Sequence, residues 1–181
     1  MKRALLFALA LAACQDEITQ NVEPVALRAE TIGFYCQMNL LEHDGPKGQV
    51  HLEGLPGAPL FFSQVSDLVT YLRLPEQSHN ILAIYVSDMG APGATWEMPG
   101  ETNWIDARTA HYVVGGDLAG GMGAPELAPF ADFDKAQEFV ASHGGRILPL
   151  DEIPTSAVLV PGEEEDGPDD YSDRLRALTR G

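Results

Sequence analysis

The chain has 181 residues, of which 27 are Asp or Glu and 11 are Lys or Arg, so its formal net charge is -16. Such an acidic chain is not expected to bind nucleic acid, because phosphate contacts need clustered basic side chains. Hydrophobic residues make up 45% of the sequence, which is enough for a packed core in one compact domain or two small ones.

The N-terminus has the pattern of an export signal, predicted over residues 1–13. Its uncharged apolar stretch, 5–13, is too short to span a bilayer. The sequence Leu11-Ala12-Ala13-Cys14 resembles the lipobox of bacterial lipoproteins, in which the Cys carries the lipid and becomes the new N-terminus. An ordinary signal peptide with a chance Cys at its end is the alternative. With a lipobox, residues 14–30 form a lipidated tether, and lipid alone holds the protein to a membrane.

A first folded unit is predicted over residues 31–90. The apolar and β-branched runs favour strands, and a stretch with helical spacing favours a helix capped by Ser63 or Ser66. The expected elements are strands over 34–41, 48–52 and 80–87 and a helix within 60–72.

A second unit is predicted over residues 103–160, after a Gly- and Pro-rich linker at 91–102. It is expected to hold one or two strands within 104–114, a helix over 133–142 with Asp134 as its N-cap, and a closing strand over 146–150. Both units therefore follow the order strand, strand, helix, strand, which predicts an α+β fold built from duplicated ββαβ units. Residues 161–181 form an acidic tail that is expected to be disordered.

The predicted strand 34–41 carries a thiol and a thioether, at Cys36 and Met38. Side chains at i and i+2 of a strand point to the same face, and thiolate and thioether are the soft ligands that select Cu(I). If lipid consumes Cys14, Cys36 has no intramolecular partner, which in an exported protein favours a reactive or ligand role. His43 lies close downstream and is a competent copper ligand. The alternative is a buried, inert Cys-Met pair, since both residues are common in cores.

Met122 stands among glycines, in Gly120-Gly121-Met122-Gly123. A Met in this setting is hard to explain as a core residue, and glycines let a backbone approach closely or move. A loop that presents one thioether would suit a site that must accept and release an ion. The alternative is a surface loop with an incidental Met.

The remaining candidates carry less chemistry. Met89 and Met98 flank the linker and could serve as accessory ligands for a second ion, or could simply cover apolar surface. The sequence contains no His-Glu-x-x-His, Gly-x-Ser-x-Gly, phosphate-cradling loop or Cys-x-x-Cys, so an enzyme is not expected. The other histidines are interpreted as ordinary surface or packed residues: His51, His79, His111 and His143.

Taken together, these motifs resemble the NosL family of copper-binding lipoproteins from nitrous oxide reductase gene clusters. The resemblance runs from Cys14 to about Ile153 and depends on the order of the motifs more than on any one of them. They are the lipobox, Cys36-x-Met38, His43 before Gly45-Pro46 and Gly48-Gln49, Val86-x-Asp88, Trp104-Ile105-Asp106-Ala107, Tyr112-Val113-Val114, Met122-Gly123 and Gly144-Gly145.

The resemblance implies a Cu(I) metallochaperone, lipid-anchored in the periplasm of a denitrifying bacterium. It would supply copper to nitrous oxide reductase, together with a membrane transporter-type maturation complex. Cys36 and Met38 would bind the metal, Met122 would supply a third ligand, and His43 would be a further candidate. The family fold is a duplicated ββαβ arrangement similar to that of organomercurial lyase.

Two other functions are compatible with the sequence. The first is a thiol-dependent enzyme with an organomercurial lyase-like fold, although that chemistry works with a pair of cysteines and lipidation of Cys14 would leave one. The second is a docking lipoprotein that binds no metal and whose Cys36 thiol is buried and inert.

Overall fold

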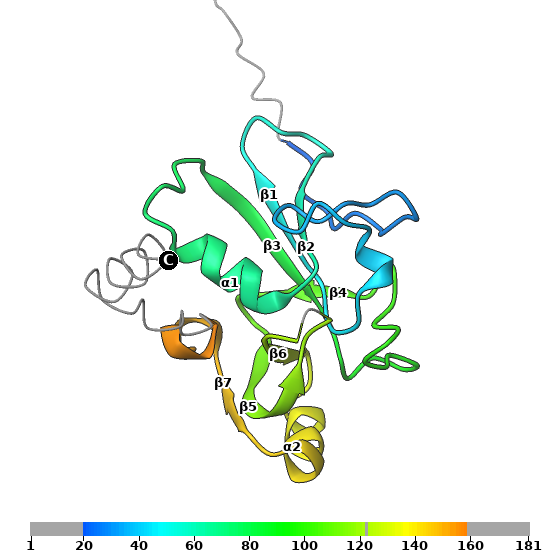
Figure 1. Cartoon of the computed structure of the whole chain (residues 1–181). Coiled ribbons are helices and arrows are strands. Elements are labelled where there is room, and N and C mark those ends of the chain that lie inside the picture. Colours follow the sequence, from blue (N-terminus) through cyan, green and yellow to red (C-terminus); the bar gives the residue numbers. More distant parts are fainter. Residues whose placement is uncertain (1–19, 122, 159–181) are drawn as a thin grey trace, which may run out of the picture.

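The structure is a computed structural model that describes residues 20–121 and 123–158. It contains two antiparallel sheets, with strand orders β2-β1-β3-β4 and β6-β5-β7 (Figure 1). The first sheet and its helix are made by β1 (Gly48–Leu52), β2 (Leu60–Phe62), α1 (Val65–Arg73), β3 (Ile81–Ser87) and β4 (Trp104–Asp106). The second sheet and its helix are made by β5 (His111–Ala119), β6 (Pro125–Phe130), α2 (Phe133–His143) and β7 (Arg146–Leu148).

The predicted duplication of ββαβ units is confirmed. In each sheet the first strand of the unit is central, and its second and third strands flank it with the helix between them in the chain. We call β1, β2, α1 and β3 the first unit, and β5, β6, α2 and β7 the second unit; β4 adds an edge strand to the first sheet. The predicted signal peptide, the tail 161–181 and residues 14–19 of the predicted tether lie outside the described residues.

The strand predicted over 34–41 is wrong. The chain turns back on itself here, because Gln37 N–H donates to Gly33 O (3.0 Å) and Gly33 N–H donates to Met38 O (3.0 Å). Leu40–Glu42 then form a short 3₁₀ turn, η1. Because this run is not a strand, the first strand of the unit is β1, which begins at Gly48.

Two helix boundaries also differ from the prediction. Residues Leu60–Phe62 pair with β1 as strand β2, so α1 begins only at Val65, and neither Ser63 nor Ser66 caps it. Helix α2 is found where it was predicted, but its N-cap is Asp132 rather than Asp134.

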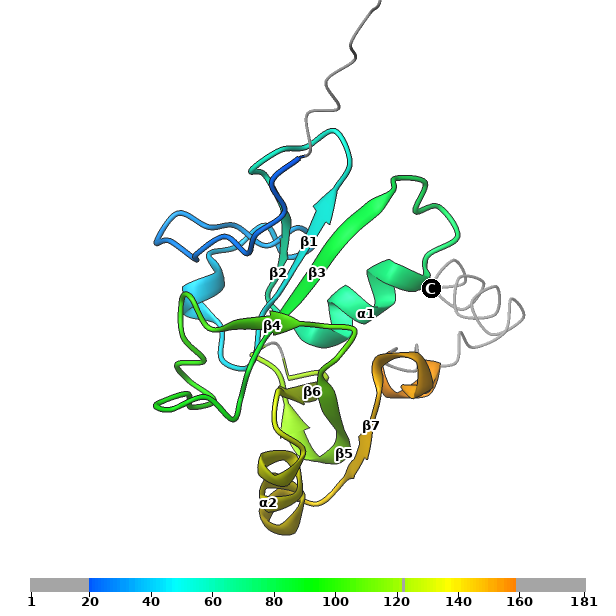
Figure 2. The same ribbon diagram turned by 180° about the vertical axis from the view of Figure 1, so that it is seen from behind.

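Helix α1 joins the two sheets. It packs against β1 and β2 of the first sheet and against β6 of the second, whereas α2 lies on the side of the second sheet away from the first (Figures 1 and 2). Tyr112 and Leu127 of the second unit therefore share one buried apolar cluster with Phe62 and Leu68 of the first unit. Two more 3₁₀ turns, η2 (Leu150–Glu152) and η3 (Thr155–Ala157), follow β7. Among residues 20–121 and 123–158 there is no helix whose length and apolar character would let it cross a bilayer.

Candidate metal centre

Two of the three predicted sulfur ligands, Cys36 and Met38, lie in a tight turn, which we call the sulfur turn (residues 33–38). Cys36 is a free, partly buried cysteine, and its Sγ lies 3.9 Å from the Met38 carbonyl oxygen. The Met38 side chain is 44% exposed. The arrangement differs from the strand expected from sequence, but it still brings a thiol and a thioether together at the surface.

Gln37 makes this turn possible. Its φ of 54° is in the left-handed region, which is unfavourable for a residue with a side chain. The Gln37 amide compensates by donating to the carbonyls of Phe34 (2.7 Å) and Gly33 (3.3 Å). The turn is therefore held by its own side chain as well as by its backbone.

Gly33 sets the position of the thiol. A Cβ added at Gly33 would overlap Cys36 Sγ and would lie 3.2 Å from Leu40 Cδ1. The sulfur thus occupies the space that a side chain at position 33 would fill, and the thiol packs directly on the backbone of the turn.

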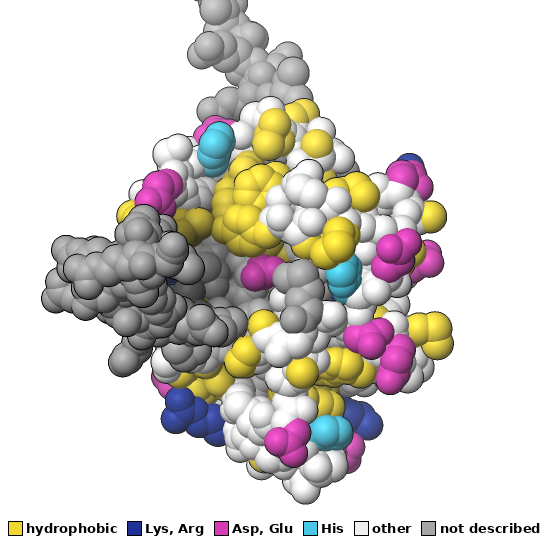
Figure 3. Space-filling model, in the orientation of Figure 1, with side chains coloured by type: hydrophobic (Ala, Val, Ile, Leu, Met, Phe, Trp, Pro, Cys, Tyr) yellow, Lys and Arg dark blue, Asp and Glu magenta, His cyan; other side chains and the backbone are white. Residues whose placement is uncertain are grey.

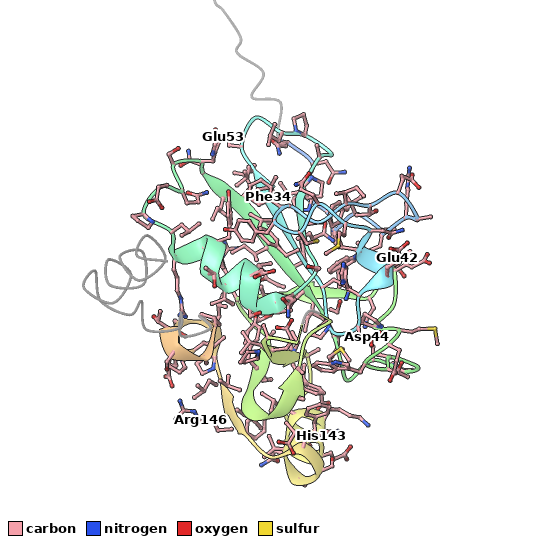
Figure 4. The ribbon with its side chains drawn as sticks, viewed as in Figure 1. Phe34, Glu42, Asp44, Glu53, His143 and Arg146 are labelled. Atoms are coloured by element: carbon pink, nitrogen blue, oxygen red, sulfur yellow. The ribbon has the colours of Figure 1, made fainter. Side chains whose placement is uncertain are left out.

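Aromatic residues fix the sulfur turn to the first unit. Phe34 N–H donates to Phe61 O (2.7 Å) at the end of the first sheet. The rings of Phe34 and Tyr35 pack edge-on to Phe62, with ring centroids 5.9 and 5.6 Å apart, and Phe34 also meets Tyr71 of α1 (Figure 4). The turn is consequently anchored on one side while its sulfurs remain accessible.

His43 follows η1 and has a buried nitrogen. Asn39 begins η1 by accepting from Leu41 N–H (3.0 Å), and His43 ends it. The Nε2 atom of His43 is buried and has no hydrogen-bond partner among the described residues. A buried polar atom without a hydrogen-bond partner is unfavourable. This nitrogen is therefore suited to accept a hydrogen bond or to bind a metal ion.

Lys47 holds the backbone beside His43. Its side chain is 1% exposed, and Nζ donates to the carbonyls of His43 (2.6 Å), Gly45 (2.6 Å) and Asp44 (3.2 Å). Burial lowers the pKa of Lys47 to about 8, and the charges of Glu126, Asp44 and Cys36 act in the opposite direction. A cation is therefore buried directly beneath the candidate site.

The β5–β6 hairpin brings its glycine-rich end to the same place. A Cβ at Gly121 would lie 2.8 Å from Asp44 N and 3.0 Å from His43 Cβ, so the two backbones are in close contact. Met122 itself lies outside the described residues. Its predecessor in the chain nevertheless packs on His43, so segments about 80 residues apart in sequence meet at this site.

Glu126 ties the hairpin to α1. Its carboxylate accepts from the N–H groups of Val65 (3.2 Å), Ser66 (2.9 Å) and Leu127 (2.7 Å). Burial raises the pKa of Glu126 to about 8, although the hydrogen bonds from Leu127 and Ser66 oppose the shift. The cap that α1 lacks in its own sequence is thus supplied by a strand of the other unit.

The structure thus places Cys36 and Met38 in one turn and His43 directly after η1, and it shows Gly121 in close contact with His43 and Asp44. Cys14 and Met122 cannot be placed, because both lie outside the described residues. The described part of the chain contains no group of three or more His, Cys, Asp or Glu residues that could hold a metal ion. Sequence reasoning missed Gly33, Gln37, Lys47 and Glu126, none of which carries a local sequence signal for these roles.

Comparison with known protein families now identifies the chain. The family model NosL matches residues 24–158. The chain belongs to the NosL family. A relative named "Copper-binding lipoprotein NosL", from Achromobacter cycloclastes, is 54% identical over 97% of this chain and 94% of its own length. A second NosL relative with that name, from Stutzerimonas stutzeri, is 37% identical over 83% of this chain and 77% of its own length.

The fold also agrees with a solved NosL structure. The crystal structure of the copper chaperone NosL from Shewanella denitrificans matches with a TM-score of 0.66 and 30% identity, and the match covers 72% of this chain and 95% of that one. The similarity to the organomercurial lyase fold stays a prediction.

Proposed function

We propose that this chain binds copper as Cu(I) through the thiolate of Cys36 and the thioether of Met38, with Met122 and His43 as further ligands. The sulfur turn is the observation that carries the proposal. It presents a free thiol and a thioether, and His43, five residues further along the chain, has a buried nitrogen without a partner among the described residues. Thiolate and thioether are soft ligands that favour Cu(I), and imidazole also suits copper. The names of the NosL relatives support copper as the metal.

Met122 is proposed as a ligand because of what surrounds it in the chain. Gly121 packs on His43 and Asp44, and Gly123 N–H donates to Gly120 O (2.8 Å). Gly121, which precedes Met122 in the chain, is therefore next to the proposed ligand His43. This proximity supports a site that is completed by the second unit.

Copper is the cargo rather than a resident cofactor in this proposal. On binding, the Cys36 thiol releases its proton and the thiolate forms a bond to Cu(I), so affinity should fall as the pH is lowered. On release, a sulfur or nitrogen ligand of the acceptor forms a bond to copper as one of the chain's own ligands leaves. The exposed Met38 is the ligand that an acceptor can reach first.

An apolar surface surrounds the sulfur turn and favours delivery to another protein. Ten large hydrophobic side chains are exposed among the described residues, and five of them lie between positions 32 and 41. They are Ile32, Phe34, Tyr35, Met38 and Leu41. Figure 3 shows hydrophobic side chains gathered above α1, in the region where Figure 4 labels Phe34. Exposed apolar patches of this kind commonly mark interaction sites.

We propose nitrous oxide reductase and its membrane transporter-type maturation complex as the recipients. We also propose that lipid on Cys14 anchors the chain to a membrane in the periplasm. The lipobox-like sequence supports the anchor, as do the relatives named lipoproteins. Carriage of copper, rather than catalysis, is the proposed role.

Anaerobic Cu(I) titration against a chromophoric chelator tests the site. Cys36→Ser should weaken binding by about 100-fold or more, since even residues outside the ligand set cost about 10–100-fold at metal sites. Met98→Leu is the control, because Met98 is 70% exposed and, although the sequence allows it as an accessory ligand for a second ion, it is not a ligand of the proposed site. Wild-type affinity in Cys36→Ser, or an equal loss in Met98→Leu, would reject the site.

Delivery needs a separate measurement. Copper-loaded protein should activate copper-free nitrous oxide reductase in the presence of the maturation complex. Ile32→Ser and Leu41→Ser should slow the transfer without changing Cu(I) affinity, because both residues are exposed on the apolar surface and carry no proposed ligand atom. Undiminished transfer by both variants would remove this surface from the proposal.

A further inference from the structure

We infer that Lys47 is a positioning residue of the copper site, which fixes the backbone of residues 43–45 so that His43 is held ready for the metal. The inference depends on the proposed copper site. Lys47 itself touches no copper in this scheme, and it acts only through the segment that it holds.

The Lys47 ammonium has a hydrogen-bond partner for each of its donors. A Lys side chain has three N–H donors and no acceptor, and Nζ of Lys47 has one carbonyl partner for each donor, from His43, Asp44 and Gly45. Three consecutive carbonyls therefore converge on one cation. A neutral side chain of similar length could not satisfy all of them.

The backbone of Lys47 is itself fixed to strand β3. Lys47 directly precedes β1, and its backbone is fixed to the next strand: its N–H donates to Ser87 Oγ (3.0 Å), and its O accepts from Ser87 N–H (2.9 Å). The ammonium is thus held from the central strand of the first sheet. Sites supported by strands are more precise than sites supported by loops alone.

Residues 43–45, whose carbonyls bind Lys47, include His43 and contact two other parts of the chain. His43 has the buried Nε2 without a partner, Gly121 packs on His43 and Asp44, and Gly45 N–H donates to Trp96 O (2.6 Å). Lys47 thus binds the carbonyls of residues 43–45. This segment carries the imidazole of His43 and contacts both the end of the β5–β6 hairpin and the linker. Without the ammonium these buried or partly buried carbonyls would have to turn toward water, and His43 would move with them.

The test compares two buried side chains of neighbouring positions. Lys47→Met removes the charge and the donors but keeps the length of the side chain. Gln49→Met is the matched control, because Gln49 is also fully buried, lies two residues further along, and bonds to the backbone of Val25 instead (Val25 N–H donates to its Oε1 at 2.9 Å, and its Nε2 donates to Val25 O at 3.0 Å).

Lys47→Met should bind Cu(I) about 10–100-fold more weakly than wild type. Its copper X-ray absorption spectrum should lose the nitrogen neighbour that we assign to His43, while Gln49→Met keeps both affinity and spectrum. Wild-type affinity and spectrum in Lys47→Met would overturn the inference, as would equal losses in the two variants. If Lys47→Met does not fold, Lys47→Gln retains two donors and should give a smaller loss in the same direction.

A copper-free measurement separates this inference from the proposed function. In the apo protein, hydrogen exchange of the Gly45 amide should speed up about tenfold or more in Lys47→Met, because its bond to Trp96 O is on the held segment. The Phe34 amide, bonded to Phe61 O, should keep its protection. Unchanged exchange at Gly45 would overturn the positioning role, whereas normal copper binding by Cys36→Ser would overturn the copper site alone.

Discussion

The two units have the same strand order but very different interiors. Among the described residues, the buried polar or charged side chains lie in the first unit or directly beside it, with one exception. The exception is Glu126, which accepts hydrogen bonds from the helix of the first unit. Helix α1 buries five residues, whereas α2 buries only Ala136. The first unit thus has a polar, densely contacted interior, and the second has a lightly packed helix on its outer side.

This difference shows how a duplicated fold can be divided between support and chemistry. Buried polar groups lower stability unless each finds a partner, so they are retained where they position something. In the first unit the buried Lys47 holds the backbone of residues 43–45, and the buried Gln49 holds that of Val25. The second unit reaches this part of the first unit through its β5–β6 hairpin. Gly121 packs on His43 and Asp44, and Glu126 accepts from the start of α1.

The largest expected effect comes from comparing the caps of the two helices. Glu126→Ala would leave three buried N–H groups without an acceptor and should lower the free energy of unfolding by about 3–5 kcal/mol. Asp132→Ala removes the exposed cap of α2, where Asp132 accepts from the N–H groups of Asp134 and Lys135, and should lower it by about 1 kcal/mol. Urea unfolding of both variants measures the difference. Equal losses would mean that the two units do not differ in the way described.

The pH dependence of stability sharpens the same contrast. The pKa of Glu126 is raised from 4.5 to about 8 in the folded protein, so between these values the folded state keeps a proton that the unfolded state has lost. The contribution of Glu126 to stability is therefore fully present below pH 4.5 and is lost as the pH rises through 8. The free energy of unfolding of wild type, minus that of Glu126→Gln, should fall by about 3 kcal/mol between about pH 5.5 and about pH 8.

The comparison with Glu126→Gln removes the titrating groups that do not interact with Glu126. Lys47 does interact with it, because the charge of Glu126 raises the pKa of Lys47. Burial lowers the pKa of His51, which gives a slope of the opposite sign, because that contribution is lost as the pH falls. Since His51 is present in both proteins, its slope cancels in the difference. A difference that does not change with pH would show that Glu126 is ionised in the folded protein throughout this range.

The repeat and part of the site could be predicted from the sequence, because they depend on local signals. Apolar periodicity located α2, and a β-branched run located β3. Cys36, Met38 and His43 are close in the chain, so the candidate site did not depend on the strand that was predicted for it, and their role as ligands stays a prediction. The error at 34–41 arose because an apolar run does not reveal a turn that depends on the side chain of Gln37.

The parts that sequence reasoning missed depend on distant contacts. Strand β6 contains Pro125 and Pro129, which argue against a strand, but β6 is an edge strand and edges tolerate proline. Lys47, between Pro46 and Gly48, has the sequence pattern of an exposed turn residue, and its burial follows from the folding of the 43–45 segment around it. The cap of α1 comes from Glu126, about 60 residues away, so no local pattern could have indicated it.

The smallest expected effect tests whether thiol placement is specific to the first unit. Gly33→Ala and Gly90→Ala both add a methyl group in a crowded position with ordinary backbone geometry. At Gly33 the methyl meets Cys36 Sγ, whereas at Gly90 it meets Lys135 Cβ and Phe130 Cδ1, each at 3.2 Å. Copper affinity should fall about tenfold, or about 1.4 kcal/mol, in Gly33→Ala and should not change in Gly90→Ala.

Thiol labelling of the copper-free protein decides how such a loss arises. If Gly33 positions Cys36, the added methyl must push the sulfur out of the space that it occupies, and the thiol should react faster with a disulfide reagent. Overpacking alone would lower the stability of both variants to a similar extent and leave the labelling rate unchanged. Faster labelling confined to Gly33→Ala would therefore show that the sulfur turn is shaped around its thiol, whereas equal rates would assign Gly33 to packing.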